Sequence, residues 1–208
     1  YDGKNTLVSD WGEYSPQTRE AVFNYHVKLT NERFTLTSDT LHYNTLTKIT
    51  HIVGPSNINS DGNRSYTERG YYDTAKDYAE LFDRSVVING KSTMTGDSMY
   101  YDKKNGKMHA YNNIVYNDKG NKNLLTGDYC EYDDTTGYAM ATKNAVVRDY
   151  SSPDTLFMHA DTFKIFTYNI RTDSVYRLVH GYHKARAFRS DVQSVCDSLK
   201  YDSNNKKM

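Results

Sequence analysis

Seven acidic residues recur along the chain at nearly regular intervals, and their spacing is the first pattern that could carry chemistry. They are Asp10, Asp39, Glu68, Asp97, Asp128, Asp161 and Asp197. The first three intervals are 29 residues, and the next three are 31, 33 and 36. Equivalent acids on every second strand of a sheet would lie roughly 9 to 10 Å apart. Such a row is either a set of acids that bond backbone N–H groups at bends or an ion-binding ladder.

Other patterns of catalytic or metal-binding residues are weak. His180 and His183 lie close together in the sequence, and strand alternation would point them to opposite faces. The sequence has no glycine-rich phosphate loop, nucleophile elbow or helix-borne metal motif. Asp133 and Asp134 fall in an expected turn, whereas a glycosidase requires two facing carboxylates at a defined separation. We therefore expect no enzyme activity, no metal site and no cofactor.

Composition and cysteine placement narrow the class of protein. The 208 residues include 26 basic and 26 acidic side chains, and zero net charge disfavours nucleic-acid binding by phosphate neutralisation. Cys130 and Cys196 occupy non-equivalent positions of the repeat, so we expect no disulfide. The chain starts at Tyr1 and stops within its seventh repeat, which suggests a piece of a longer protein.

Each acid belongs to a repeated motif. A small residue precedes the acid, an apolar residue follows two positions later, and an aromatic and a polar residue close the motif, as in residues 38–44 (SDTLHYN) and 96–102 (GDSMYYD). A period of about 20 to 50 residues indicates stacked supersecondary units. We therefore predict a single repeat domain over residues 1–208, with about seven repeats.

Each repeat contains two segments with strand character. The acid motif is one, and an alternating segment such as residues 23–29 (FNYHVKL) is the other. Asn89-Gly90 and Asn105-Gly106 are typical of tight hairpin turns, because those turns need positive φ. Short turns at both connections predict consecutive antiparallel strands in an all-β chain.

The strands are expected to bend. Leu36 and Ser38 have one parity and Leu41 and Tyr43 have the other, so all four face inward only if the strand bends or bulges near Asp39. The second segments have small or turn-prone residues at comparable places, which are Asn24, Gly54, Asp83, Asn112 and Gly181. Stacked V-shaped strands predict an elongated trough, similar to a β-jellyroll, with an apolar interior crease.

The crease is predicted to hold the apolar side chains with inward parity, and these are the candidate lipid-binding residues. They are Leu7, Phe23, Val27, Leu36, Leu41, Val86, Ile88, Met94, Met99, Ile114, Leu125, Val147, Met158 and Phe163. A basic cluster, Lys184, Arg186 and Arg189, is either a solvated strand face or a contact for phosphate or carboxylate groups of a lipid headgroup.

The seven tandem motifs together resemble the OstA-like family of periplasmic lipopolysaccharide-transport bridge proteins. Departures are Glu68, Ile165 in place of the aromatic residue, and a longer turn between Tyr168 and Tyr176. The resemblance implies a non-catalytic trough that shields acyl chains of lipopolysaccharide in the periplasm of a Gram-negative bacterium, with outer-membrane association as a further option. It also implies partners of the same fold in a transport bridge.

A second class stays open, and the ends of the stack carry a further expectation. A β-repeat surface or adhesin-type protein would bind glycans or proteins through its tyrosine-rich exterior. An interior wide enough for acyl chains favours lipid transport, and a crease filled by side chains favours the alternative. Residues 7–14 and 197–201 are expected to form bare edges, which predicts head-to-tail self-association or pairing with a protein of the same fold.

Overall fold

The computed structural model describes residues 6–30, 32, 34–60, 62–170 and 172–208, and its regular elements are all strands. They are β1 (Thr6–Val8), β2 (Trp11–Ser15), β3 (Glu20–Thr30), β4 (Phe34–Asn44), β5 (Ile49–Ser60), β6 (Asn63–Asp73), β7 (Tyr78–Asn89), β8 (Ser92–Asp102), β9 (Lys107–Asp118), β10 (Asn123–Asp133), β11 (Tyr138–Asp149), β12 (Leu156–Tyr168), β13 (Tyr176–Arg189) and β14 (Val192–Asp202). The described residues include no helix long and apolar enough to cross a membrane. The predicted all-β fold class is confirmed.

The chain forms two compact units. Unit 1 comprises Tyr1–Gly90 and Asp97–Lys104, and unit 2 comprises Lys91–Gly96 and Asn105–Met208, so β8 contributes one half to each. In unit 1, β3 to β7 pair antiparallel in chain order, and β1 and β2 both pair with β3. In unit 2, β9 to β14 pair antiparallel in chain order. The single domain over residues 1–208 stays a prediction.

Two kinds of strand alternate along each unit. The strands that carry the acid motif, here called acid strands, are β4, β6, β8, β10, β12 and β14. The strands between them, called return strands, are β3, β5, β7, β9, β11 and β13. Asn24 pairs with Thr40 and Val27 pairs with Ser38, so two residues of β3 oppose Asp39 alone. Such a bulge bends the strand and reverses its parity, which confirms the bend predicted near Asp39.

The return strands bend through residues in the left-handed region. Two consecutive residues have positive φ at Tyr25-His26, Asp83-Arg84, Asn112-Asn113, Lys143-Asn144 and His183-Lys184, and Gly54 has φ 91° in β5. The bends expected at Gly54, Asp83 and Asn112 are confirmed. Those expected at Asn24 and Gly181 are wrong, because the ladder register places the surplus residues one to two positions later, at side chains without a strong turn preference.

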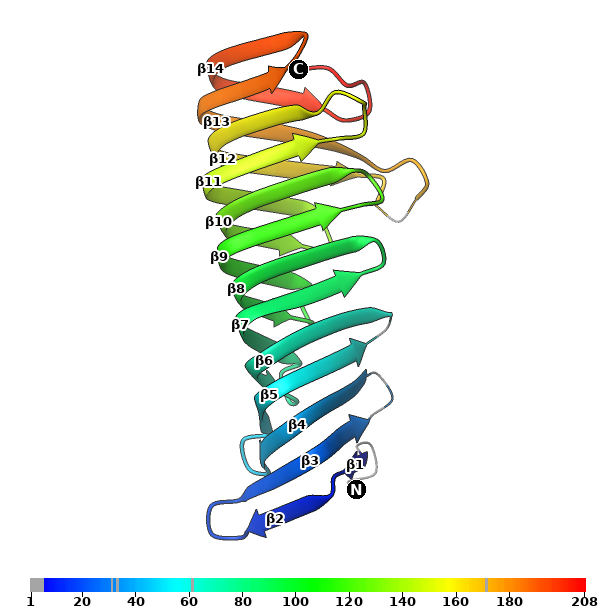
Figure 1. Cartoon of the computed structure of the whole chain (residues 1–208), viewed down its shortest axis with the longest axis vertical. Coiled ribbons are helices and arrows are strands. Elements are labelled where there is room, and N and C mark those ends of the chain that lie inside the picture. The colour runs from blue at the N-terminus through cyan, green and yellow to red at the C-terminus, as the bar shows by residue number, and fades with distance from the viewer. Residues whose placement is uncertain (1–5, 31, 33, 61, 171) are drawn as a thin grey trace. The chain divides into compact units, whose positions relative to one another are not determined.

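Each strand therefore has two halves that meet at a corner (Figure 1). In acid strands, the first arm is the half before the acid. In return strands, the first arm is the half after the bend. The other half of each strand is called the second arm. The ends of the arms away from the corner form the mouth, and the connections there differ in length, from residues 190–191 to residues 169–175.

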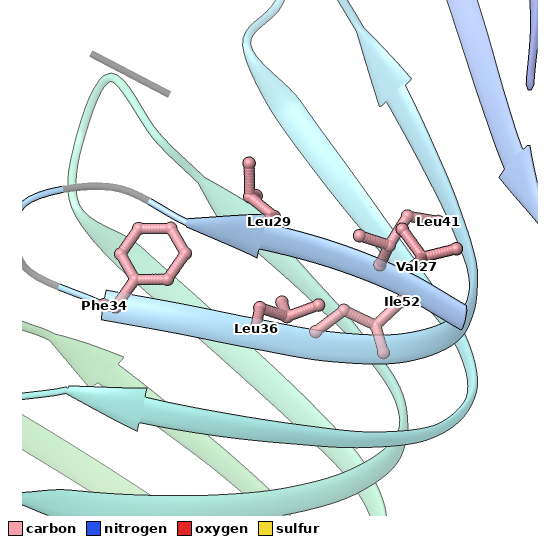
Figure 2. Packing of buried hydrophobic residues seen from close by; sticks show 6 residues of the cluster. All are labelled: Val27, Leu29, Phe34, Leu36, Leu41 and Ile52. Atoms are coloured by element: carbon pink, nitrogen blue, oxygen red, sulfur yellow. The ribbon is translucent and has the colours of Figure 1, made fainter. Parts of the chain in front are cut away.

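The apolar core lies between the arms. In unit 1 it is a cluster of Val27, Leu29, Phe34, Leu36, Leu41 and Ile52 (Figure 2), against which Leu7, Phe23, Ile58 and Tyr72 pack. Val27, Leu41 and Ile52 lie near the corner, and Phe34 lies at the far end of its strand. In unit 2, Met158 and Phe163 are among the most buried side chains, at 1% and 0% exposure.

Phe163 gives a direct test of this core. Truncation of Phe163 to alanine should lower the free energy of unfolding by about 3 to 5 kcal/mol, because it leaves a cavity beside Gly181 and Ala160. The matched control is Phe157→Ala in the same strand, where the side chain is 40% exposed and a small effect is expected. Urea denaturation measures both, and equal effects would contradict the arrangement of the two faces of β12.

Candidate functional site: the crease between the arms

Most of the predicted crease residues meet in the interior. The buried ones are Val27, Leu36, Leu41, Met94, Met99, Ile114, Leu125, Val147, Met158 and Phe163. Leu7 and Phe23 are half-buried and pack against the cluster of unit 1. The alternation of the sequence on both sides of each acid therefore located the interior face of these strands.

Val86 and Ile88 do not face the crease. A row of cross-strand partners runs from Leu36 through Ile58 and Ser65 to Val87, and Ile88 is 39% exposed. The inward parity predicted for Val86 and Ile88 is therefore off by one residue. Residues 86–88 are all apolar, so hydrophobicity alone did not reveal which of them face inward.

The floor of the crease at the corner is polar in unit 1. Ser56 Oγ donates to Ser38 Oγ, and Ser85 Oγ donates to Thr67 Oγ1, each at 2.7 Å. These hydroxyls also bond carbonyl oxygens at the bends, such as those of Thr40 and Gly54. The pairs satisfy polar groups that the bend would otherwise leave buried. Sequence analysis missed them, although a serine or threonine before the acid was their signal.

In unit 2 the same floor is built from small residues. Gly127, Ala145, Ala160 and Ala185 are all buried there. The missing side chains let larger neighbours such as Phe163 reach the corner, where Phe163 lies against Gly181. The floor of the crease is thus lined by hydroxyl groups in unit 1 and by small apolar residues in unit 2.

The mouth of unit 2 is bridged by an ion pair between the arms. Arg177, in the second arm of β13, donates from Nη2 to Asp118 Oδ2 at 3.1 Å, and Asp118 ends the first arm of β9. Four ladder steps separate β9 from β13, which is about 19 Å within one arm. The contact therefore joins the two arms across the mouth of unit 2.

A second bridge joins β11 to the C-terminal end of β14. Tyr201 Oη donates to Asp149 Oδ2 at 2.7 Å, and Lys206 Nζ lies 3.0 Å from the same oxygen. Lys206 Nζ also donates to Ser151 Oγ at 2.6 Å. Burial opposes ionisation of Asp149, but the hydrogen bonds from Ser151, Tyr201 and Lys206 outweigh it and lower the pKa of this carboxyl.

The mouth of unit 1 is also spanned by contacts between the arms. The ring of Phe34 meets that of Tyr72 edge to face, with centroids 5.4 Å apart. Lys103 Nζ donates to Ser60 Oγ at 3.1 Å. In both units the arms therefore touch at the corner, in the core and at the mouth.

The acid row pairs with side chains of the return-strand bends. Asp10 lies 2.7 Å from His26 Nδ1, Asp161 lies 3.8 Å from Lys184 Nζ and Asp197 lies 3.7 Å from His183 Nδ1. The hydrogen bond with Asp10, helped by its charge, raises the pKa of His26. In the described part of the chain, no three His, Cys, Asp or Glu side chains are placed to hold a metal ion. Asp10, Asp161 and Asp197 thus pair across the corner.

Bonds to backbone N–H groups come from the last residue of the motif. Asn44 accepts from the N–H groups of Leu46 and Thr47, and Asp133 accepts from those of Thr135 and Thr136. These backbone bonds lower the pKa of Asp133 against the effect of its partial burial. Turn residues at this position of the motif therefore bond backbone N–H groups, and the same role for the corner acids stays a prediction.

The three basic headgroup candidates do not cluster. Lys184 lies at the corner of β13, Arg186 is exposed, and Arg189 ends the first arm, about 17 Å along the strand from Lys184. Arg189 bonds Asp191 through two nitrogens, at 2.5 and 3.0 Å. It also lines a small pocket at the mouth, together with Leu156, Val192, Tyr201, Lys206 and Met208.

Comparison with known proteins gives two similarities. The family model described as OstA-like protein matches residues 1–39, which confirms the resemblance over the first repeat. No curated protein matches the chain. Among solved structures, the chain is similar to LptH from Pseudomonas aeruginosa, described as the LptA homologous periplasmic component of the conserved lipopolysaccharide transport device. The identity is 20% and the TM-score 0.49, over 52% of this chain and 82% of that chain.

Asp149 makes the bridge of β11 to β14 testable by pH. Its lowered pKa means that its contribution to stability is complete above the unfolded-state value of about 3.9 and is lost as the pH falls through the folded-state value. Asp149→Asn should therefore cost about 1 to 3 kcal/mol at pH 7 and remove part of the acid sensitivity.

Urea denaturation at pH 7 and at pH 3 measures both effects. The control is Asp173→Asn, at an exposed position of the long turn after β12, which should change neither value. An Asp149→Asn protein with wild-type stability at pH 7 would show that the bridge contributes nothing.

Proposed function

We propose that this chain is a non-catalytic, periplasmic lipid-binding module that shields acyl chains of lipopolysaccharide on their way to the outer membrane. The observation that carries the proposal is the apolar crease, which lies between two arms along both units. The match of residues 1–39 to the OstA-like family model supports the same class of protein.

The energetics of the crease suit acyl chains. Each methylene group moved from water to an apolar site gains about 0.8 kcal/mol, so chain length rather than headgroup dominates the affinity of a crease. Leu41 and Phe163 have 0% exposure, because the arms pack on each other there. We infer that acyl chains enter when the arms separate and that lipid then replaces contacts between the arms.

The proposed lipid contacts follow from this geometry. They are the buried crease residues together with Leu7 and Phe23. Val86 and Ile88 are left out because their side chains have the outward parity. Arg189 is kept as a headgroup contact because it lies at the mouth, whereas Lys184 and Arg186 lie at the corner and on the exposed face.

One observation favours the alternative, a surface protein that binds glycans or proteins. His51, Tyr71, Phe82 and Tyr100 form an edge-to-face row on the second arm of unit 1, with successive centroids 4.6, 5.9 and 6.1 Å apart. Their edges are turned to one another, an arrangement that also stabilises neighbouring strands. Phe82→Ala would weaken glycan binding and leave lipid binding unchanged if the alternative holds.

A matched pair of variants tests whether lipid binds in the crease. Ile114 is 2% exposed and Ile88 is 39% exposed, and both lie in the first arm of a return strand. Ile114→Arg should reduce binding of an acylated amphiphile at least tenfold, because the crease would then hold an unpaired charge. Ile88→Arg should leave binding unchanged.

Displacement of a fluorescent apolar probe by lipopolysaccharide measures affinity, and circular dichroism verifies the fold of each variant. Ile114→Asn replaces the arginine variant if that one unfolds. Native mass spectrometry of the purified wild-type protein should also detect a bound amphiphile. Wild-type affinity in a folded Ile114 variant would show that the crease is not the lipid site.

The edges of the stack support the proposed partners. Among the described strands β14 pairs with β13 alone, and Val195 on this strand is 81% exposed. Strand β1, with Val8 at 61% exposure, lies at the other edge. We infer that these edges pair with a protein of the same fold or with a second copy of this chain, which would extend the crease.

Proline substitution tests this edge pairing. Light scattering should show concentration-dependent association of the wild-type chain, and Val8→Pro with Val195→Pro should give a monomer, because proline removes a backbone donor and cannot extend a ladder. If the wild-type chain stays monomeric at high concentration, self-association through these edges is wrong. The edges would then pair only with a different protein.

A further inference from the structure

The first arm of unit 2 exposes two neighbouring phenylalanines on the face turned away from the crease. Of the seven phenylalanines in the chain, Phe157 and Phe188 are largely exposed, at 40% and 53%, and the other five are buried or half-buried. These two are direct cross-strand partners on β12 and β13. Strand β12 also pairs with β11, and β13 also pairs with β14. The exposure therefore belongs to the face of the sheet and not to its edge.

The two rings are separate from the apolar core. Met158 and Ala187, the chain neighbours of Phe157 and Phe188, are buried in the crease, and successive side chains of a strand point to opposite faces. The rings therefore lie on the reverse side of the crease. Single exposed apolar residues are common on protein surfaces, but contiguous ones rimmed by polar groups mark an interaction surface.

Two arginines flank this pair of rings. Arg148 is the cross-strand partner of Phe157, and its guanidinium carbon lies 5.4 Å from the ring centroid. Arg186 is exposed on the same face of β13, two residues nearer the corner than Phe188. Within the described part of the chain, neither arginine forms an ion pair with a carboxylate. We call Arg148, Phe157, Arg186 and Phe188 the outer patch.

No carboxylate shares this face among the described residues. Its side chains form two cross-strand rows over β9 to β14, one from Asn117 to Gln193 and one from Val115 to Val195. The members of both rows are apolar, neutral polar or basic. The face is therefore positively charged, although the net charge of the chain is zero.

Unit 1 provides an internal comparison. The row at the matching position of its first arm runs across β3 to β7 from Thr30 to Ile88. In this row Arg64 is the basic residue and Ile88 the apolar one, and the others are threonine or asparagine. The strand scaffold thus accepts a polar outer face. The composition of the outer patch is not a requirement of the fold.

We propose that the outer patch docks unit 2 on the surface of an anionic phospholipid bilayer. A bilayer places phosphate groups directly outside its acyl chains. Exposed phenyl rings can therefore enter the acyl boundary while guanidinium groups beside them bond phosphate oxygens. Mobile lipid phosphates can meet two unpaired guanidinium groups without a matched partner surface, which an acidic protein would have to provide.

This inference goes beyond the proposed function, because it concerns the opposite face of the strands and does not depend on lipid in the crease. Each arginine near an anionic surface should strengthen binding about fivefold. Because these charges are exposed, salt should screen their attraction to the lipid phosphates.

Co-sedimentation of the full chain with large vesicles tests the docking. One set of vesicles contains phosphatidylcholine alone, and the other contains phosphatidylcholine and phosphatidylglycerol in equal amounts. The wild-type protein should bind the anionic vesicles at least tenfold more tightly, and high salt should weaken this binding. Arg148→Gln with Arg186→Gln should bind both sets equally. Equal binding by the wild-type protein would contradict the role of the two arginines.

A matched pair of double variants locates the surface. Arg148→Gln with Phe157→Ser changes cross-strand partners of the outer patch and should lower affinity for anionic vesicles at least tenfold. Arg64→Gln with Ile88→Ser changes the matching partners in unit 1 and should alter the affinity less than twofold. All four side chains are exposed, and circular dichroism verifies that both variants fold.

Displacement of an apolar probe by lipopolysaccharide gives a separate measure of the crease. The variant of Arg148 and Phe157 should retain wild-type displacement, and a loss would show that the two faces are not independent. Equal loss of vesicle binding in both double variants would overturn the outer patch as the docking surface. If the wild-type protein sediments with neither set of vesicles, bilayer docking is wrong, whatever the result for the crease.

Discussion

Each return strand has one residue more than the acid strand that it faces at the corner, and the geometry of both units depends on that surplus. The extra residue reverses side-chain parity, so apolar residues on both sides of the acid reach the same interior. It also requires left-handed backbone at ordinary side chains such as Tyr25 and Lys143, at about 1 to 2 kcal/mol per residue. Burial of the crease offsets this cost, because an unbent strand would turn half of its apolar residues to water.

The corner and the mouth hold the arms together in different ways. At the corner the connection is covalent and repeated in every strand, so the angle between the arms is set by the backbone. At the mouth the described residues of the two arms meet through side chains, such as Phe34 with Tyr72 in unit 1 and Arg177 with Asp118 in unit 2. A crease that admits lipid must open on the side where no backbone has to rearrange. Under the proposed lipid-binding function, the chemistry of the mouth would therefore determine which molecules enter.

Much of the fold could be predicted from the sequence, because the acid motif marks every second strand and the tight turns mark their ends. The parity break around Asp39 identified the bend, and the inward orientation predicted for Leu36, Ile114 and Phe163 was right. The signal failed where neighbours are chemically alike, as in the apolar residues 86–88. It also failed where a bend uses residues with no turn preference, as at Tyr25. The ion pairs at the mouth join residues far apart in the sequence, such as Asp118 and Arg177, and nothing local marks such pairs.

The repeats differ in length in a way that follows from the corner. The acid is the sixth residue of every acid strand, from Asp39 in β4 to Asp197 in β14. Extra residues appear instead in connections at the mouth, such as residues 119–122 and 150–155, and in the longer strands β12 and β13. Insertions are thus confined to positions where they leave the ladder register intact. An ancestral unit could therefore be copied in tandem, and the mouth connections of each copy could then change independently. Ligand recognition could diverge in this way while the strand scaffold stayed constant.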